Sequence, residues 1–369
     1  MIAKHTGLSV AVLALSIVIA SPASAADLIY STWVSAEHHL TRNVVVPFAA
    51  ELEEKTGGAV KFEIASGGAL AKPRETLEAI SNGTVDAGYI VDIYFPSSLP
   101  QTALLGDLAL LVDDAVAATA AMNETVLLDC AECRASLENQ NVVPIGFIST
   151  STYKLQCTKP VAKLDDLRGL RVRATGAWAP MFSDLGATPV NIPISEVYEA
   201  LQRGALDCSV GPVSHLPSYS LYEVVTDVND MPMGAYAGGL TLNLRKEAWE
   251  ALTAEQRALF LELAPKYVAI GIFGYNATDE EAAAKGREQG ITWHPAAPDI
   301  KVAYDAYNAQ SVAAVIAKGK ADAAIGDAEA LVKSFTENLE KWRGIRSKIG
   351  DDRAAFEQAL RDEIYVKLN

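Results

Sequence analysis

Several short motifs that mark enzyme active sites are missing from this sequence of 369 residues. It contains no Gly-x-x-x-x-Gly-Lys loop for phosphates, no Gly-x-Gly-x-x-Gly dinucleotide turn and no Gly-x-Ser-x-Gly nucleophile elbow. Ser209 comes nearest to the elbow, but its segment, Asp-Cys-Ser-Val-Gly, lacks the leading glycine. Nucleotide chemistry and serine hydrolysis are therefore unsupported, and we expect no cofactor.

Histidine is also scarce, with five in the chain. None belongs to a spaced metal-binding pair such as His-Glu-x-x-His. His38 and His39 are adjacent, which aims their side chains apart in an extended segment. We therefore expect no metal site, and a solvated or ligand-facing role for this pair.

Positive charge is in deficit, because 31 lysines and arginines face 46 acidic residues and the formal net charge is −15. Such a surface repels nucleic acid and anionic lipid, so we expect no nucleic-acid partner. If the ligand is itself an anion, a local basic group must attract it against the overall field. Individual arginines are therefore the candidate anion-binding residues.

Long hydrophobic runs are confined to the N-terminus. A basic start at Lys4 precedes an apolar run from Leu8 to Ala20 and the small-residue site Ala23-Ser24-Ala25. This pattern predicts a secretory signal peptide cleaved after Ala25, because the run is shorter than the roughly 20 residues that span a bilayer. We expect a soluble protein in the periplasm.

The four cysteines lie in a protein expected in an oxidising compartment, where three pairings are possible. We favour Cys130 with Cys133, which are close in sequence, and Cys157 with Cys208, which fall in predicted strands. The Cys-x-x-Cys spacing of the first pair also fits a thiol-disulfide enzyme. The residues before it are typical of a helix rather than of a thioredoxin-like strand, which favours a structural clip.

After the predicted signal peptide, the sequence predicts strands and helices in the order β-α-β-α-β, which implies a parallel sheet with crossover helices. One helix-turn-strand unit then occurs twice: residues 75–87 match residues 196–208, with Glu, Glu-Ala, Gly and Asp at equivalent positions. The copies are too far apart for a small-repeat solenoid and fit equivalent elements of two similar domains. Ligands of open α/β sheets bind beyond strand carboxyl ends, here near residues 90–94 and 210–212.

Near the other end of the chain, Thr253 and Gln256 predict a capped helix, interrupted at Pro265.

An arginine-rich strand is predicted at residues 167–173, where apolar and basic residues alternate. By pattern alone, Arg171 and Arg173 fit a solvated strand face better than a carboxylate site. Arginine at a strand end is nevertheless suited to gripping a carboxylate through two parallel hydrogen bonds.

Residues 167–173, 185–190 and 195–207, in that order, resemble the DctP-type substrate-binding proteins of TRAP (tripartite ATP-independent periplasmic) transporters. The resemblance covers nearly the whole chain after residue 25. It implies a two-domain, periplasmic-binding-protein-like α/β fold with two crossing segments, a long domain-spanning helix and a helical C-terminus. It also implies a monomeric, non-enzymatic protein that captures a small organic acid between its domains and delivers it to the membrane permease subunits. A binding protein for a different transporter or receptor would have a similar fold.

We expect a signal peptide at residues 1–25 and a first domain from residues 26–150 and 239–278. The second domain is expected from residues 151–238 and 279–369, including the C-terminal helices.

The resemblance places Arg173 at the family's carboxylate-binding position. The other predicted ligand-binding residues are Trp33, Asp92, Tyr94, Tyr153, Trp178 and Gly211, of which the aromatic residues fit a core position equally well. Some relatives have a second basic or amide group where this chain has Tyr153 and Gly211, so a ligand with several acidic groups is less expected. The Glu-Trp pair of keto-acid-binding relatives is replaced by Val210-Gly211, which disfavours a metal-bridged ligand. Asp92 would suit a ligand with hydroxyl or amino donors.

Overall fold

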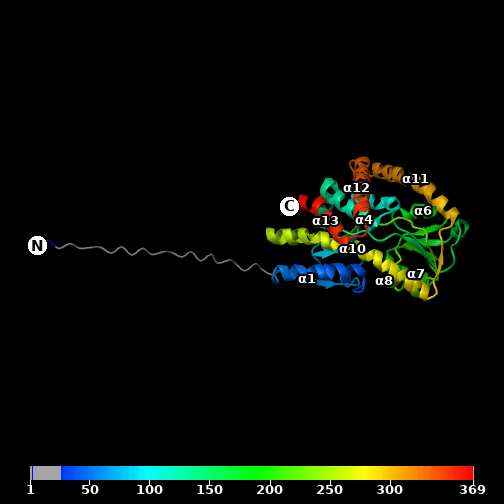
Figure 1. The fold of residues 1–369 in the computed structure, drawn as a ribbon, viewed down its shortest axis with the longest axis horizontal. Helices are drawn as coiled ribbons and strands as arrows, with labels where there is room; N and C mark the ends of the chain where they lie inside the picture. Colours follow the sequence, from blue (N-terminus) through cyan, green and yellow to red (C-terminus); the bar gives the residue numbers. More distant parts are fainter. Residues whose placement is uncertain (1, 3–25, 369) are drawn as a thin grey trace.

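The first lobe of the protein begins with a parallel three-stranded sheet. The computed structural model describes residue 2 and residues 26–368, so the predicted signal peptide, Ile2 apart, lies outside the described residues. Figure 1 shows two α/β lobes with helices around their sheets. Strand β1 lies between β2 and β3 and runs parallel to both. The elements of this unit are β1 (Ala26–Ser31), α1 (Val46–Lys55), β2 (Val60–Ala65), α2 (Thr76–Ser81) and β3 (Ala87–Gly88).

The second lobe repeats this arrangement. Its central strand β7 lies between β8 and β9, again parallel to both, so the strand order of the first lobe recurs. The elements are β7 (Arg171–Arg173), α6 (Trp178–Asp184), β8 (Thr188–Val190), α7 (Val197–Gln202) and β9 (Cys208–Gly211). The sequence repeat at residues 75–87 and 196–208 therefore corresponds to α2–β3 in one lobe and α7–β9 in the other.

The identical residues of the repeat make equivalent contacts. Asp86 accepts a hydrogen bond from the backbone N–H of Ile29 in β1 (2.9 Å), and Asp207 accepts one from the N–H of Arg171 in β7 (2.9 Å). Each carboxylate also pairs with a guanidinium, that of Arg245 and that of Arg171 respectively. Gly83 and Gly204 end the two helices with φ of 79° and 67°, a conformation that glycine adopts at little cost. Both lobes thus tie the third strand to the first through one aspartate.

We expect Asp207→Asn to lower the free energy of unfolding by about 1–2 kcal/mol at neutral pH, because hydrogen bonds to a charged group are lost. Hydrogen bonds from Arg171, then Lys159, hold the pKa of Asp207 well below its ordinary value. The contribution is therefore complete above the unfolded-state pKa of about 3.9 and is lost as the pH falls below it. Urea unfolding between pH 3 and 8 measures this, and a stability difference between wild type and variant that grew towards low pH would contradict it.

Two crossing segments join the lobes. Residues 148–153 run from β5 (Val142–Phe147) to β6 (Lys154–Cys157), and residues 230–238 return from β10 (Asp227–Asn229) to β11 (Gly239–Arg245). The segments pair through backbone hydrogen bonds, including Thr150 N–H to Tyr236 O (2.9 Å) and Tyr153 N–H to Gly234 O (2.8 Å). Strands β4 (Ile90–Val91), β11 and β5 form an antiparallel sheet. The complete sheet of the second lobe has six strands in the order β12-β10-β6-β9-β7-β8, where β12 is Thr292–His294. The domain boundaries predicted near residues 150 and 238 fall in these segments.

The long helix α10 (Ala254–Glu288) begins with the predicted capping box of Thr253 and Gln256. It contacts α1 and β5 in the first lobe and α8 (His215–Ser218) in the second. The predicted interruption at Pro265 is wrong, because the helix continues through it. Ala264 and Val268 are fully buried on either side, so tertiary packing offsets the missing hydrogen bond. By length and composition alone, α10 could cross a membrane. Much of its apolar stretch is buried inside the protein, as in the core helix of a folded domain.

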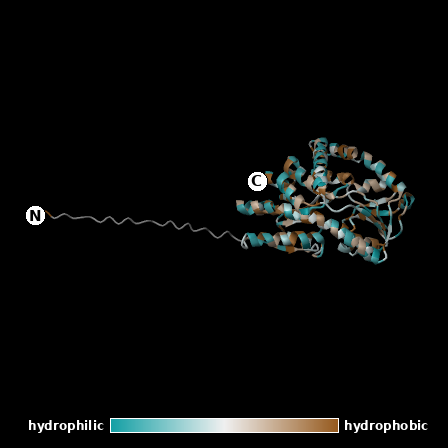
Figure 2. Cartoon of the chain, viewed as in Figure 1, coloured by the Kyte–Doolittle hydropathy of each residue, from teal (hydrophilic) through white to brown (hydrophobic). Residues whose placement is uncertain are grey.

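The C-terminal helices pack on elements of both lobes. Helix α12 (Ala328–Ile349) packs on α4 (Ala115–Glu124), and α13 (Arg353–Glu363) packs on α10. Helix α11 (Pro298–Ala321) contacts both the first-lobe turn η3 (Asp107–Leu111) and the second-lobe helix α6. Figure 2 shows hydrophilic and hydrophobic residues interspersed along these helices. The apolar face of α12 therefore needs a partner, and α4, whose residues are all buried, provides it. The remaining helices are α3 (Pro100–Gly106), α5 (Ala131–Asn139) and α9 (Lys246–Ala251).

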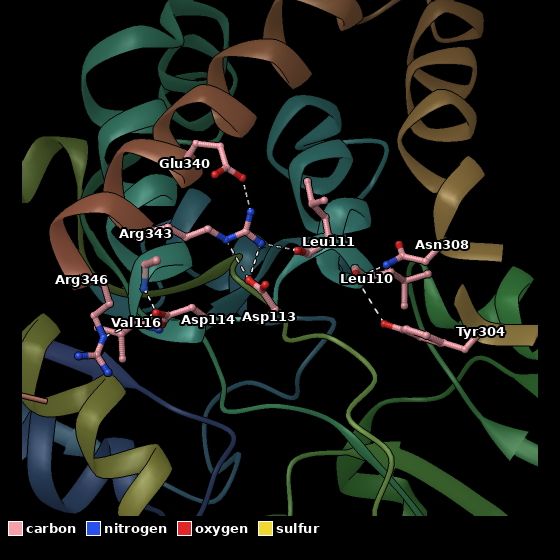
Figure 3. Close-up of polar contacts among 11 residues, drawn as sticks. Leu110, Leu111, Asp113, Asp114, Val116, Tyr304, Asn308, Glu340, Arg343 and Arg346 are labelled. Carbon is pink, nitrogen blue, oxygen red and sulfur yellow. Dashed lines mark hydrogen bonds and ion pairs between the residues drawn. The ribbon is translucent and has the colours of Figure 1, made fainter. Parts of the chain in front are cut away.

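Polar contacts fix α11 and α12 on the first lobe (Figure 3). On α12, Arg343 donates to the Asp113 carboxylate (Nε–Oδ1 2.9 Å) and to the carbonyl of Leu111 (3.0 Å). On α11, Asn308 donates to the carbonyl of Leu110 (3.0 Å). These contacts hold the end of η3 and the residues after it between the two helices.

The described residues contain two disulfides, Cys130–Cys133 and Cys157–Cys208. This is the pairing that the sequence favoured. The first lies at the start of α5, and the second joins β6 to β9 within the second-lobe sheet.

Candidate ligand-binding cavity

A narrow cavity lies where the two lobes and the crossing segments meet. The space between its atoms, part of it open to solvent, amounts to about 410 Å³. The first lobe contributes Trp33, His38, Tyr89, Val91, Ile93 and Tyr94; the crossing segments contribute Thr150, Tyr153 and Tyr236; the second lobe contributes Arg173, Thr175, Ile194, His215 and Tyr219; and α10 contributes Tyr275. Val91, Ile93 and Tyr94 of the predicted strand end at residues 90–94 lie in its lining, whereas none of residues 210–212 does.

Arg173 enters this cavity from the carboxyl end of β7 and is 3% exposed. Its guanidinium donates to the carbonyls of Ile192 (3.0 Å) and Val210 (3.3 Å) and to the hydroxyl of Tyr94 (3.1 Å). Within the described part of the chain, no carboxylate lies within 4 Å of it as an ion pair. A buried charge without an opposite partner is costly, which makes this guanidinium the candidate group for binding an anion.

The neighbouring Arg171 behaves differently. It is exposed at the start of the same strand and pairs with Asp207 (Nε–Oδ2 3.0 Å). The two arginines that the sequence pattern could not tell apart thus have separate roles, Arg171 in holding the fold and Arg173 at the cavity.

The cavity carries its positive charge on Arg173. Burial, with a smaller contribution from His39, lowers the pKa of His38 to about 3. Burial and then the Arg173 charge lower the pKa of His215 well below its ordinary value. Both histidines are therefore neutral at physiological pH, and Arg173 is the one permanently charged residue among the described residues of the cavity lining.

The structure brings four of the predicted ligand-binding residues together in the lining: Arg173, Trp33, Tyr94 and Tyr153. Trp33 stacks on Tyr89 with ring centroids 5.2 Å apart, and its indole N–H donates to the Tyr89 carbonyl (3.0 Å). Tyr94 reaches Arg173 through its hydroxyl, as described above. These aromatic side chains are buried and face the cavity, so they serve the core and the site at once.

The other three predicted residues lie behind the lining. Asp92 accepts a hydrogen bond from the Tyr236 hydroxyl, and burial raises the pKa of its carboxyl well above the ordinary range. Trp178 stacks under Tyr153 with centroids 4.1 Å apart. Gly211 leaves room for His215, since a Cβ there would lie 2.4 Å from the imidazole Nδ1. All three support residues of the lining from outside it.

Sequence reasoning missed several residues of the lining, chiefly His215, Tyr219 and Tyr275. They come from α8, the residue after it and α10, and no local pattern distinguishes them from core residues. His38 was expected to be solvated or to face a ligand, and it lines the cavity. Three or more metal-ligating side chains do not converge anywhere in the described residues.

Besides the Arg173–Tyr94 hydrogen bond, an exposed polar contact joins the lobes beside the cavity. Arg74 of the first lobe donates to the side chain of Asn191 in the second (3.1 Å), and its guanidinium lies 5.7 Å from the centroid of the Tyr94 ring. Both side chains are exposed at this contact. The contact requires the two lobes to be close together at this point.

We expect Asn191→Ala to speed ligand dissociation by about 1.4- to fivefold, because an exposed polar contact contributes about 0.2–1 kcal/mol. Stopped-flow fluorescence measures this rate. Arg168→Ala is the matched control, since Arg168 is exposed and pairs with Asp165 of its own lobe (2.8 Å). Equal rates for Asn191→Ala and the control would show that the Arg74–Asn191 contact does not hold the lobes closed.

Two similar α/β lobes, two crossing segments and a buried cavity between them define a solute-binding protein. The comparisons with known proteins agree. The profile of DctP, bacterial extracellular solute-binding protein family 7, matches residues 30–318, and the chain belongs to that family. It is a family of transport solute-binding proteins rather than of enzymes, and its members work outside the cytoplasm.

Among the curated relatives, a solute-binding protein of Albidiferax ferrireducens is 25% identical over 245 residues, which cover 66% of this chain and 71% of the relative. The solved structures include a TRAP solute-binding protein from Rhodoferax ferrireducens in complex with copurified benzoate, with a TM-score of 0.77 at 16% identity; the match covers 87% of this chain and 99% of the other. They also include DctP7 of Bordetella pertussis, an extracytoplasmic solute receptor binding pyroglutamic acid, with a TM-score of 0.74 at 21% identity over 86% of this chain and all of the other. These structures share the two-lobe fold.

Proposed function

We propose that this protein is the extracytoplasmic receptor of a TRAP transporter and that it captures one small organic acid between its lobes. The observation that carries the proposal is Arg173, a buried guanidinium that faces a cavity with no carboxylate partner among the described residues. A bound carboxylate would accept parallel hydrogen bonds from it in a site shielded from water, where such bonds are strong. The two structural relatives described above hold benzoate and pyroglutamic acid, each with one carboxyl group, which supports the same chemistry here.

In this proposal the ligand-binding residues are Arg173, Trp33, Tyr94 and Tyr153, with Asp92, Trp178 and Gly211 holding the lining in place. The receptor works as a monomer after cleavage behind Ala25, and the loaded, closed form is what the membrane permease recognises. The protein performs no catalysis. Cys133 is fully buried in its disulfide and lies outside the cavity lining, which supports a structural clip over a thiol-disulfide enzyme.

The direct test is to compare carboxylates with their uncharged primary amides by thermal shift and calorimetry. A ligand at a hundred times its Kd stabilises the folded state by about 2.7 kcal/mol, so a binding acid raises the melting temperature clearly. We expect at least one acid to bind with a stoichiometry of one while its amide does not bind. Acids and amides that bind equally, or a panel without any binding acid, would contradict the proposal.

A further inference from the structure

The cavity that would hold the proposed organic acid is lined mainly by aromatic rings. Seven of its fifteen residues are tyrosine or tryptophan: Trp33, Tyr89, Tyr94, Tyr153, Tyr219, Tyr236 and Tyr275. The sequence as a whole contains few aromatic residues, 7% counting phenylalanine. Aromatic side chains are therefore concentrated at this one place.

These rings are held rigidly in position. Trp33 stacks on Tyr89, with Tyr94 tilted beside it at 6.3 Å between centroids. His215 meets Tyr219 edge to face, with centroids 5.1 Å apart. A flat ring fits a narrow space between such faces and edges, because aromatic pairs prefer offset-stacked and edge-to-face geometry. A saturated ring of equal carbon number is thicker and lacks the charge distribution that favours these contacts.

The charges of the cavity limit the ligand to one carboxylate. Arg173 is the one lysine or arginine among the described lining residues. The next cation beside it, Arg74, is exposed and bonded to Asn191. A second carboxylate would be buried without a partner, which is costly.

The uncharged polar groups of the described lining residues are hydroxyls, imidazoles and an indole rather than carboxylates or amides. Among the described residues, the lining has no aspartate, glutamate, asparagine or glutamine, the side chains that offer strong acceptors to hydroxyl groups. The imidazole Nδ1 of His215 is buried and has no hydrogen-bond partner in the described part of the chain. Other neutral polar groups of the lining are the hydroxyls of Thr150, Thr175 and the tyrosines and the imidazole of His38, which suit a carboxylate oxygen or a substituent on the ring.

We infer that the ligand is an aromatic monocarboxylate, with its carboxylate on Arg173 and its ring between the aromatic side chains of the first lobe and the crossing segments. This inference rests on the proposed function and narrows it to one class of acid. Sugar acids, aliphatic dicarboxylates and saturated cyclic acids are excluded as preferred ligands.

Calorimetry with paired acids tests the inference: benzoate against cyclohexanecarboxylate, and phenylacetate against cyclohexylacetate, with succinate, galacturonate and pyroglutamate as competitors. We expect at least one aromatic acid to bind about tenfold more tightly than its saturated partner, the scale of one or two aromatic contacts. Tighter binding of succinate, galacturonate, pyroglutamate or a saturated acid than of every aromatic acid would overturn the inference and leave the proposed function standing. Absence of binding by all of these acids would count against both.

Variants at Trp33 separate ring recognition from general damage to the site. Trp33→Leu is expected to reduce the preference for the aromatic over the saturated acid severalfold, whereas Trp33→Phe keeps it. Trp249→Leu is the control, because Trp249 packs on Phe260 away from the cavity (5.8 Å between centroids) and its loss should leave the preference unchanged. An unchanged preference in a folded Trp33→Leu protein would overturn the placement of the ring.

Discussion

Arg173→Met is expected to weaken binding of the organic acid by at least tenfold. Each hydrogen bond to a charged group contributes about 1.5–3 kcal/mol, and every 1.4 kcal/mol changes an affinity tenfold. Methionine fills similar space without charge, so the ligand-free protein should melt close to the wild-type temperature. Removing a buried charge without an acidic partner relieves a desolvation cost that offsets the three hydrogen bonds lost to Ile192, Val210 and Tyr94.

Arg171→Met is the matched control on the same strand. Arg171 pairs with Asp207 and does not line the cavity, so its replacement should lower stability and leave the affinity unchanged. Calorimetry on both variants distinguishes the two roles. Wild-type affinity in Arg173→Met, or equal losses in both variants, would contradict the assignment of the anchor.

The two disulfides are expected to differ in their effect on stability. Removing Cys157–Cys208 by a double alanine substitution should lower the free energy of unfolding by about 4 kcal/mol. This disulfide closes a span of 51 residues, and the entropy that a disulfide removes from the unfolded chain grows with the span that it closes. Removing Cys130–Cys133, with a separation of 3, should cost about 2 kcal/mol by the same relation. The Cys157–Cys208 bond also fastens β6 to β9, next to the strand end that carries Val210 and Gly211.

Urea unfolding of both double variants measures this difference, and ligand affinity is measured on the same samples. The Cys130–Cys133 variant should bind ligand as the wild type does, because that disulfide lies outside the cavity lining. Equal destabilisation by the two variants would contradict the dependence on span. An insulin-reducing activity that is present in the wild type and lost in the Cys130–Cys133 variant would favour the thiol-disulfide enzyme instead.

The repeated parts of the fold were predictable from sequence because their physical requirements are local. The helix-ending glycines Gly83 and Gly204 and the strand-tying aspartates Asp86 and Asp207 must recur wherever the unit recurs. Their recurrence predicted two similar lobes. Arg173 was singled out through resemblance to a family, since its strand pattern alone did not separate it from Arg171.

The rest depends on tertiary contacts that no local pattern records. Asp92 follows a strand end as a ligand-binding residue would, but its carboxylate turns to Tyr236, which is 144 positions away. Pro265 would interrupt an isolated helix, and burial on both sides of it keeps α10 continuous. The amphipathic pattern of α12 shows that it needs an apolar partner without saying which one. The aromatic lining comes from segments separated by up to 242 positions, from Trp33 to Tyr275, and therefore became apparent only in the folded chain.

A crystal structure of the protein with a bound aromatic acid tests the central claim most directly. The account predicts one ligand in the cavity between the lobes, its carboxylate oxygens within about 3.2 Å of the Arg173 guanidinium nitrogens, and its ring against Trp33. An acid bound elsewhere, or an Arg173 side chain turned into bulk solvent while the acid is bound, would contradict it.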